Sequence, residues 1–209
     1  MKVSKLVSFL NSKYPFKISS REPFKVLIST ILSQRTRDEN TEIASSNLFS
    51  KYTTPQAIAD ARLEDIESPI KPAGFYRVKA RRIREISRII LRKFNGRVPS
   101  SFEELLTLPG VGRKTANCVL VFAYGKDALP VDTHVHRISN RLGLVSSRTP
   151  HQTEAKLKSV IPKRHWKPIN AQLVQFGREI CRPINPQCSI CGLNALCQFR
   201  KKRLQIKQK

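Results

Sequence analysis

The sequence predicts an all-α fold, and two observations support this. Apolar residues recur at helical intervals in one segment after another, as in PFKVLISTILSQ at positions 23–34. No run of residues alternates apolar and polar side chains as a half-buried β-strand does. Short connections join roughly ten such segments, which fits a wholly helical architecture.

Local signals predict where several of these helices begin and end. Thr54 stands before a proline, as an N-cap does, and Ser101 precedes Glu104 by three residues, the spacing of a capping box. The segment DTHVHRISNRLG predicts a helix that starts at Asp132 and stops at Gly143.

Two segments concentrate positive charge. RVKARRIREISRIILRKF carries eight Lys or Arg and one Glu between Arg77 and Lys93, with Ile83, Ile86 and Ile90 on one stripe. The pattern predicts an amphipathic helix with a solvated charged face, or alternatively a face toward DNA. The C-terminal QFRKKRLQIKQK has six Lys or Arg and no acid, which predicts a flexible basic extension.

The overall charge favours a polyanionic partner. The 209 residues include 39 Lys or Arg against 15 Asp or Glu, a formal net charge of +24. At 40% hydrophobic residues the chain can build a core, which excludes a disordered basic tail. In a chain of one or two domains, such an excess favours DNA or RNA.

A membrane surface is the rival polyanion. No apolar run approaches the roughly 20 residues of a spanning helix, and the polar residues of MKVSKLVSFLNSKYPF argue against a signal peptide. We therefore expect a cytoplasmic protein with no membrane partner, whose cysteines stay reduced.

Four of the five cysteines form a cluster with the spacing C-x6-C-x2-C-x5-C. They are Cys181, Cys188, Cys191 and Cys197. Four thiolates this close in sequence can surround one soft metal centre. Ligand type alone leaves two occupants open, a tetrahedral zinc ion and a 4Fe–4S cluster.

The stretch LPGVGRKTA predicts a tight turn between two helices. Leu108 ends the first helix, and Gly110 and Gly112, on either side of Val111, permit backbone conformations closed to other residues. The second helix then starts near Arg113, with free N–H groups that favour a phosphate. Such a turn can merely join packed helices, but in a chain of this charge it favours a grip on a DNA backbone.

Lys114 opens a helix that is apolar nearly all round. Apolar packing and the positive end of the helix dipole both disfavour the ammonium, which favours the neutral amine and makes it a better nucleophile. The alternatives are a lysine that reaches solvent or pairs with a phosphate.

Asp132 is explained simply as the N-cap of its helix. A capping carboxylate whose second oxygen faces a cleft can have a second role. His134 and His136 lie on different faces of that helix, which makes them a poor metal pair.

The cysteine spacing, LPGVGRKTAN and VDTHVHR together resemble the endonuclease III family of DNA glycosylases. The three motifs occur in the order and at the separations of that family, and the similarity extends from about Pro23 to Cys197. The resemblance implies that the four cysteines hold a 4Fe–4S cluster with a structural role, with zinc as the alternative.

The resemblance also implies roles for single residues. Lys114 would attack C1′ of a damaged nucleotide flipped out of the duplex, and the resulting Schiff base would cleave the strand by β-elimination. Asp132 would help to deprotonate Lys114 and stabilise positive charge on the sugar. The turn residues 110–113 and His134 would contact DNA.

The implied architecture is two helical domains with the active site in the cleft between them. Residues 20–131 would form a helical barrel domain that carries the helix-hairpin-helix motif, at about 101–125. Residues 1–19 plus 132–209 would form the cluster domain, with the 4Fe–4S loop at 181–197 and a basic C-terminal tail.

Two departures from the family affect the DNA contacts. The family has a glutamine that fills the space left by the flipped base, whereas ILSQRTRD places Arg35 at that position and Gln34 one residue earlier. Either side chain can fill the gap. Phe75 stands where the family has a leucine-type wedge. The second departure is the cluster loop, where Arg182 is the only basic residue in RPINPQ and relatives often have several.

The expected function is that of a base-excision-repair DNA glycosylase. It would remove oxidised pyrimidines and cleave abasic sites in double-stranded DNA, acting as a monomer. One alternative is a mismatch or uracil DNA glycosylase of the same fold. The other is a non-catalytic DNA-binding module with a structural four-cysteine metal site.

Overall fold

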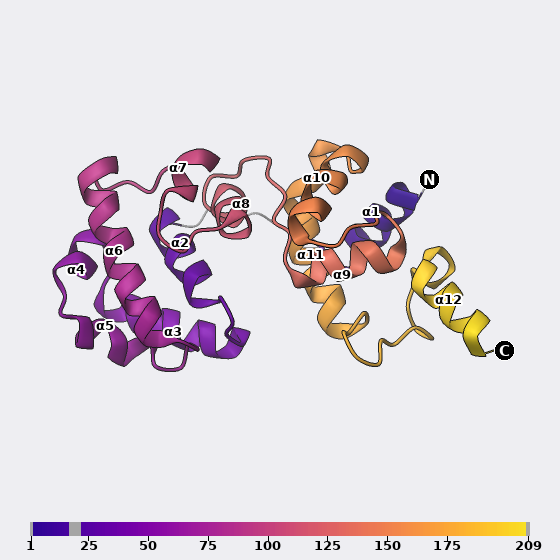
Figure 1. The fold of residues 1–209 in the computed structure, drawn as a ribbon, viewed down its shortest axis with the longest axis horizontal. Helices are drawn as coiled ribbons and strands as arrows, with labels where there is room; N and C mark the ends of the chain where they lie inside the picture. The colour runs from indigo at the N-terminus through magenta and orange to yellow at the C-terminus, as the bar shows by residue number, and fades with distance from the viewer. Residues whose placement is uncertain (1, 17–21, 208–209) are drawn as a thin grey trace. The chain divides into compact units, whose positions relative to one another are not determined.

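The computed structural model describes residues 2–16 and 22–207, and every regular element within them is helical (Figure 1). The α-helices are α1 (Lys2–Lys13), α2 (Pro23–Leu32), α3 (Asp38–Lys51), α4 (Pro55–Asp60), α5 (Leu63–Ile70), α6 (Tyr76–Phe94), α7 (Phe102–Leu106), α8 (Arg113–Phe122), α9 (Thr133–Leu142), α10 (Pro150–Val160), α11 (Trp166–Glu179) and α12 (Gln198–Lys207). Two 3-10 helices are η1 (Lys163–His165) and η2 (Asn194–Leu196). The prediction of an all-α fold is confirmed for this part of the chain. Within it, no helix has the length and apolar character needed to cross a lipid bilayer.

The chain forms two compact units. One comprises Ser19–Lys126 and contains the LPGVG turn, so we name it the hairpin unit. The other comprises Met1–Ile18 and Asp127–Lys209 and contains the four clustered cysteines, so we name it the cysteine unit. The domain boundary expected at residues 19 and 20 lies outside the described residues.

Helix α2 is the centre of the hairpin unit, where it packs against α3, α6 and α8. The Glu22 carboxylate caps its first turn by accepting hydrogen bonds from the N–H groups of Phe24 and Lys25, at 2.9 and 2.7 Å. Most of the helix is apolar and buried: Phe24, Val26, Leu27, Ile28, Ile31 and Leu32. A helix enclosed in this way fixes the direction in which the chain leaves its C-terminal end.

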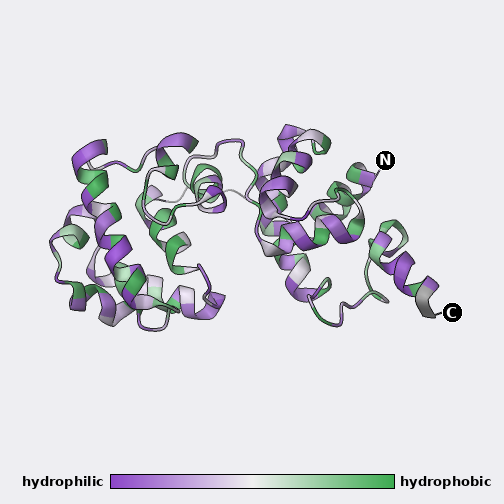
Figure 2. Cartoon of the chain, viewed as in Figure 1, coloured by the Kyte–Doolittle hydropathy of each residue, from purple (hydrophilic) through white to green (hydrophobic). Residues whose placement is uncertain are grey.

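Helix α6 packs against α2, α4 and α5 through an apolar stripe. Ile83, Ile86 and Ile90 are fully buried, as their spacing predicts, and hydrophobic and hydrophilic residues alternate along the ribbon in Figure 2. One basic residue of this helix departs from the prediction of a solvated face, because Lys79 is only 3% exposed. Its surroundings belong to the candidate site.

The predicted helix caps of the hairpin unit are confirmed. The Thr54 hydroxyl accepts a hydrogen bond from the N–H of Ala57. The Ser101 hydroxyl accepts one from the N–H of Glu104 at 3.2 Å and donates to the Glu104 carboxylate at 2.7 Å. Both helices therefore begin where short-range capping rules place them.

The core of the cysteine unit forms where α9 and α1 pack against α11. Val135, Ile138 and Leu142 of α9 are buried as predicted. Close approach of α9 to α11 requires Gly177, because a Cβ there would lie 2.5 Å from Nδ1 of His134. The packing of α11 thus holds the N-terminal turn of α9 in place.

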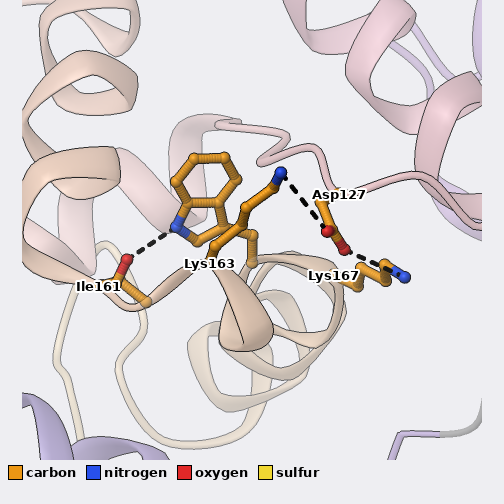
Figure 3. A network of polar contacts seen from close by, with 5 residues as sticks. Asp127, Ile161, Lys163 and Lys167 are labelled. Atoms are coloured by element: carbon orange, nitrogen blue, oxygen red, sulfur yellow. Dashed lines mark hydrogen bonds and ion pairs between the residues drawn. The ribbon is translucent and has the colours of Figure 1, made fainter.

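Asp127 is tied to the segment that leads into α11 (Figure 3). Its carboxylate forms ion pairs with Lys167 at 3.1 Å and Lys163 at 3.8 Å. The indole N–H of Trp166 donates to the carbonyl of Ile161 at 2.8 Å. The ion pairs are partly exposed and contribute little stability, so their effect is to fix the path of the chain.

The prediction of a flexible C-terminal extension is wrong for Gln198–Lys207, which form α12. Lys, Arg, Gln and Leu all favour a helix. The helix is held by Phe199, whose ring lies 4.5 Å from the guanidinium carbon of Arg141 and 5.6 Å from that of Arg203. Residues 208 and 209 lie outside the described part.

Candidate functional site

The LPGVG turn needs a glycine at one of its two glycine positions. Gly110 has φ +74°, and a Cβ there would lie 2.2 Å from Cδ of Arg82. Gly112 has φ −95°, a conformation open to any residue, so the prediction of a special backbone is wrong there. No described atom lies within 4 Å of where a Cβ of Gly112 would be, which leaves this face of the turn open to a ligand.

The helix after the turn begins at Arg113, as predicted. The preceding helix α7 ends at Leu106, two residues before Leu108. Lys114 lies in the first turn of α8 and is half-buried. No hydrogen bond or ion pair joins its ammonium to a described residue, whereas every residue from 115 to 121 is buried. The amine of Lys114 therefore stands at the edge of the unit's core.

Gln34, in the loop after α2, is bonded to the turn. Its Nε2 donates to the carbonyl oxygen of Gly110 at 3.0 Å and to the Thr115 hydroxyl at 3.4 Å. Its Oε1 accepts a hydrogen bond from Arg82 at 3.3 Å. Both ends of the Gln34 amide are thus used within the hairpin unit.

The buried Lys79 forms hydrogen bonds with the same loop. Its ammonium donates to the carbonyl oxygens of Leu32 and Gln34, both at 2.6 Å, and to the Thr36 hydroxyl at 2.7 Å. Three acceptors match the three donors of an ammonium. Burial lowers the pKa of Lys79 to about 8, and the Arg82 guanidinium acts in the same direction.

Arg35 and Phe75 lie side by side in the lining of a pocket in this unit. Both have left-handed backbones, with φ +51° and +58°, and the guanidinium carbon of Arg35 lies 5.8 Å from the centre of the Phe75 ring. Phe75 is 62% exposed although it is a large apolar residue. The pocket is lined by Gln34, Arg35, Phe75, Val78, Lys79 and Arg82. Two strained, exposed side chains beside a pocket are typical of a binding site.

In the cysteine unit, Asp132 is the N-cap of α9, as predicted. Its Oδ1 accepts a hydrogen bond from the N–H of Val135 at 2.8 Å, and Oδ2 has no such partner among the described residues. The amide of Asn170 donates to the Pro130 carbonyl at 3.2 Å and fixes the segment that leads to Asp132. The half-buried carboxylate therefore has a fixed position and a second oxygen available for chemistry.

Two arginines of α9 bind the start of the cysteine loop. Arg137 donates to the carbonyl of Cys181 at 2.9 Å and lies 3.2 Å from Nδ1 of His134. Arg141 donates to the carbonyls of Arg182 and Pro183, at 2.6 and 2.7 Å, and approaches the sulfur of Cys181 at 3.5 Å. Four residues apart on one helix, they connect the helix capped by Asp132 to the cysteines.

The four clustered cysteines line one small pocket. All four are free thiols. Burial raises the pKa of the Cys191 thiol, and the other three cysteines act on it in the same direction. In the described part of the chain, no group of three or more His, Cys, Asp or Glu side chains is arranged around a position for a single metal ion.

Lys79, Arg82, Arg137 and Arg141 were not singled out by the sequence. Lys79 had one available signal, since it stands four residues before Ile83 on the apolar stripe of α6. Nothing local distinguishes Arg82 or Arg141 from exposed arginines nearby. Their partners are more than 35 residues away in the chain, so only the fold brings them together.

Comparisons with known proteins agree with these features. The family model described as HhH-GPD superfamily base excision DNA repair protein matches residues 28–163. Endonuclease III of Thermotoga maritima is 56% identical over 201 residues, which cover 96% of this chain and 94% of that protein. A solved structure of a trapped endonuclease III–DNA covalent intermediate, an estranged-adenine complex, is 37% identical with a TM-score of 0.90, over 98% of this chain and 99% of that one.

A thermostable thymine-DNA glycosylase of known structure is also similar. It is 28% identical with a TM-score of 0.83, over 96% of this chain and 95% of that one. The family model covers more than half of the chain, and the Thermotoga relative matches almost all of it. The chain therefore belongs to the endonuclease III family, within the HhH-GPD superfamily of base excision DNA repair proteins.

Proposed function

We propose that this protein is a bifunctional DNA glycosylase and AP lyase that acts on oxidised pyrimidines in double-stranded DNA. The observation that carries the proposal is the position of Lys114, half-buried in the first turn of α8, directly after an open glycine turn. The similarity to a trapped endonuclease III–DNA covalent intermediate supports covalent chemistry with DNA.

Lys114 is the proposed nucleophile. As a neutral amine, its nitrogen forms a bond to C1′ of the flipped nucleotide while the bond from C1′ to the base breaks, and the base leaves with the electron pair. Opening of the sugar ring converts the adduct to a Schiff base. Loss of a C2′ proton then expels the 3′ phosphate and cuts the strand.

Asp132 is the proposed partner of this lysine in the reaction. One carboxylate oxygen caps α9, which keeps the group in place. We assign the other oxygen to accepting the lysine proton and to stabilising positive charge that develops on the sugar. Capping of α9 and proton transfer use different oxygens of the Asp132 carboxylate, so one residue can do both.

The glycine turn and its neighbours are proposed to hold the DNA. The open face at Gly112 lets a phosphate approach the N–H groups at the start of α8, with Gly110, Val111 and Arg113 completing the turn. Phe75 is proposed as the wedge that enters the base stack, and His134 as a further contact. In this scheme the hairpin unit grips the DNA, and the protein acts as a monomer.

Cys181, Cys188, Cys191 and Cys197 are proposed to hold a 4Fe–4S cluster. Such a cluster takes one thiolate per iron, so its ligands surround a volume, and the pocket lined by the four cysteines fits this requirement. When bound, the cluster would stabilise the loop without taking part in base removal. We expect about four irons per chain in the wild type and in Cys118→Ala, but not in Cys191→Ala. One zinc per chain would contradict this assignment.

Borohydride trapping on a duplex with thymine glycol or an abasic site tests the function. Wild-type protein should form a covalent adduct, and Lys114→Ala should not. Lys25→Ala, which removes the same charge from the first turn of α2, should trap like the wild type. If Lys114→Ala still forms the adduct, or if the wild type forms none, the proposed mechanism is wrong.

The second candidate is a mismatch or uracil glycosylase, favoured by the similarity to a thymine-DNA glycosylase. Excision rates on thymine glycol, uracil and T:G duplexes separate the two. We expect thymine glycol to be excised fastest. A preference for T:G would support the second candidate.

A further inference from the structure

We propose that α6 carries a second DNA-binding surface, with which the hairpin unit holds an undamaged duplex while a damaged duplex occupies the glycine turn and the pocket. This surface consists of five arginines of α6, which we name the arginine stripe: Arg77, Arg81, Arg84, Arg88 and Arg92. The inference rests on the proposed function for the first duplex only, because no member of the stripe lines that pocket.

The spacing of the arginine stripe places its members in one row. Steps of three and four residues keep the five side chains within an arc of about 80°, over about 22 Å of the helix. The fully buried Ile83, Ile86 and Ile90 lie on the opposite side of α6. Four members of the stripe are exposed and Arg84 is half-buried. The row therefore faces solvent along its whole length.

The pattern of charge on this face favours a polyanion over a face that is merely solvated. Neighbours in the stripe are like charges at three- and four-residue spacing, which destabilises a helix. Glu85 is the only acidic residue in the sequence of α6, and the ion pair of Arg77 with Glu67 is long, at 4.0 Å. A polyanion lying along the row would relieve this repulsion over the length of the helix.

The residue type and its contacts favour phosphate as the ligand. All five members are arginine, whose planar fork of donors binds two phosphate oxygens at once. Nε of Arg88 donates to the carbonyl of Ala59, and Nε of Arg92 donates to the carbonyl of Arg88, both at 3.4 Å. The terminal nitrogens of both guanidinium groups have no hydrogen bond to a described residue and are available to a ligand.

The arginine stripe and the pocket lie on different sides of α6. Val78 and Arg82, which line the pocket beside Phe75, are about 100° around the helix from the centre of the stripe. DNA is stiff over the length of one helix, so a duplex seated against the pocket leaves the side with the stripe uncovered. That side can bind the backbone of another duplex through its phosphates, without reading sequence.

Simultaneous contact with two duplexes predicts direct transfer between them. The protein would engage undamaged DNA through the stripe before it releases the first duplex. Its dissociation rate from the first duplex then increases with the concentration of undamaged DNA. A protein with a single DNA surface dissociates at a rate that does not depend on that concentration.

The test follows dissociation from a fluorescent duplex with a tetrahydrofuran abasic-site analogue, by anisotropy. Unlabelled undamaged duplex is varied from about 1 to 100 μM, the range of non-specific affinities. The wild-type rate should increase by about fivefold or more over this range. In the stripe variant, which combines Arg81→Gln, Arg88→Gln and Arg92→Gln, the rate should stay constant.

A matched control variant removes the same charge from exposed positions of the same unit outside α6. It combines Lys25→Gln, Lys51→Gln and Arg97→Gln, and its dissociation rate should increase as the wild-type rate does. Without undamaged DNA, the stripe variant and the control variant should bind the labelled duplex with affinities within about threefold of each other, because both lose the same long-range attraction.

Three results would overturn the inference. The first is a constant wild-type rate, and the second is an equal increase in the two variants. The third is a stripe variant that binds the labelled duplex alone more than about tenfold more weakly than the control, because the stripe would then hold the first duplex. A larger increase with duplex RNA than with DNA would assign the stripe to RNA instead.

Borohydride trapping on a natural abasic site, with the same proteins, separates these results from failure of the proposed function. Absence of a wild-type adduct contradicts the function. Normal adducts in the wild type and the stripe variant, with dissociation rates that do not respond to undamaged DNA, contradict only the second surface.

Discussion

The ammonium of Lys79 lies 2.6 Å from the carbonyl oxygen of Gln34, in the interior of the hairpin unit. This ammonium ties the loop that carries Gln34 and Arg35 to the core of the unit. A buried lysine costs free energy unless its donors are satisfied, and here three oxygens accept them.

Replacing Lys79 with methionine should destabilise the protein. The change keeps most of the side-chain volume but leaves two carbonyls and a hydroxyl without their donor, at an expected cost of about 3 kcal/mol in the free energy of unfolding. Arg81→Met, at an exposed position of the same helix, should change it by less than about 0.5 kcal/mol. Urea denaturation measures both. Equal midpoints for the two variants would show that the Lys79 contacts contribute nothing.

The same lysine should make stability depend on pH. Its pKa of about 8 in the folded protein lies below the ordinary 10.5, so between these values the unfolded chain holds more protons than the folded one. The contribution of Lys79 to stability therefore increases as pH rises through this window. The difference in unfolding free energy between wild type and Lys79→Met should grow from pH 8 to pH 10. A constant or shrinking difference would contradict this.

The two glycines of the turn should respond differently to alanine. Gly110→Ala places a Cβ against Arg82 at positive φ and should cost about 2 kcal/mol or more of stability. The Cβ of Gly112→Ala would meet no described atom within 4 Å, so stability should stay within about 0.5 kcal/mol while affinity for abasic DNA falls. Thermal unfolding and a DNA-binding titration on both variants test the pair. Full DNA affinity in Gly112→Ala would remove this turn from the interface.

Two substitutions separate the capping role of Asp132 from its proposed chemical role. Asp132→Asn keeps an N-cap for α9 but removes the carboxylate, so stability should stay close to the wild type while trapping slows by about 100-fold or more. Asp132→Ala should slow trapping similarly and also lose about 1 kcal/mol of stability. If Asp132→Asn traps at the wild-type rate, the carboxylate is only a cap.

Short-range rules account for what the sequence predicted well. The start of α8 after the glycine turn, the cap at Asp132 and the end of α9 at Gly143 each depend on residues within a few positions of one another. Burial of Ile83 follows from helical periodicity, which is also local.

Long-range contacts account for the features that the sequence did not predict. Lys79 looked like one of eight solvated basic residues because its acceptors lie 43 to 47 positions earlier in the chain. The C-terminal segment looked flexible because Phe199 finds Arg141 only in the folded unit. The spacing of the cysteines predicted their proximity but gave no sign of the arginines that hold Cys181.

The central claim is that Lys114 is the nucleophile, and peptide mapping of the reduced adduct tests it most directly. Wild-type protein is trapped with borohydride on abasic DNA, the DNA is digested to a nucleotide remnant, and the modified peptide is sequenced by mass spectrometry. The account predicts a remnant on Nζ of Lys114. A remnant on another lysine or on the N-terminal amine would contradict it.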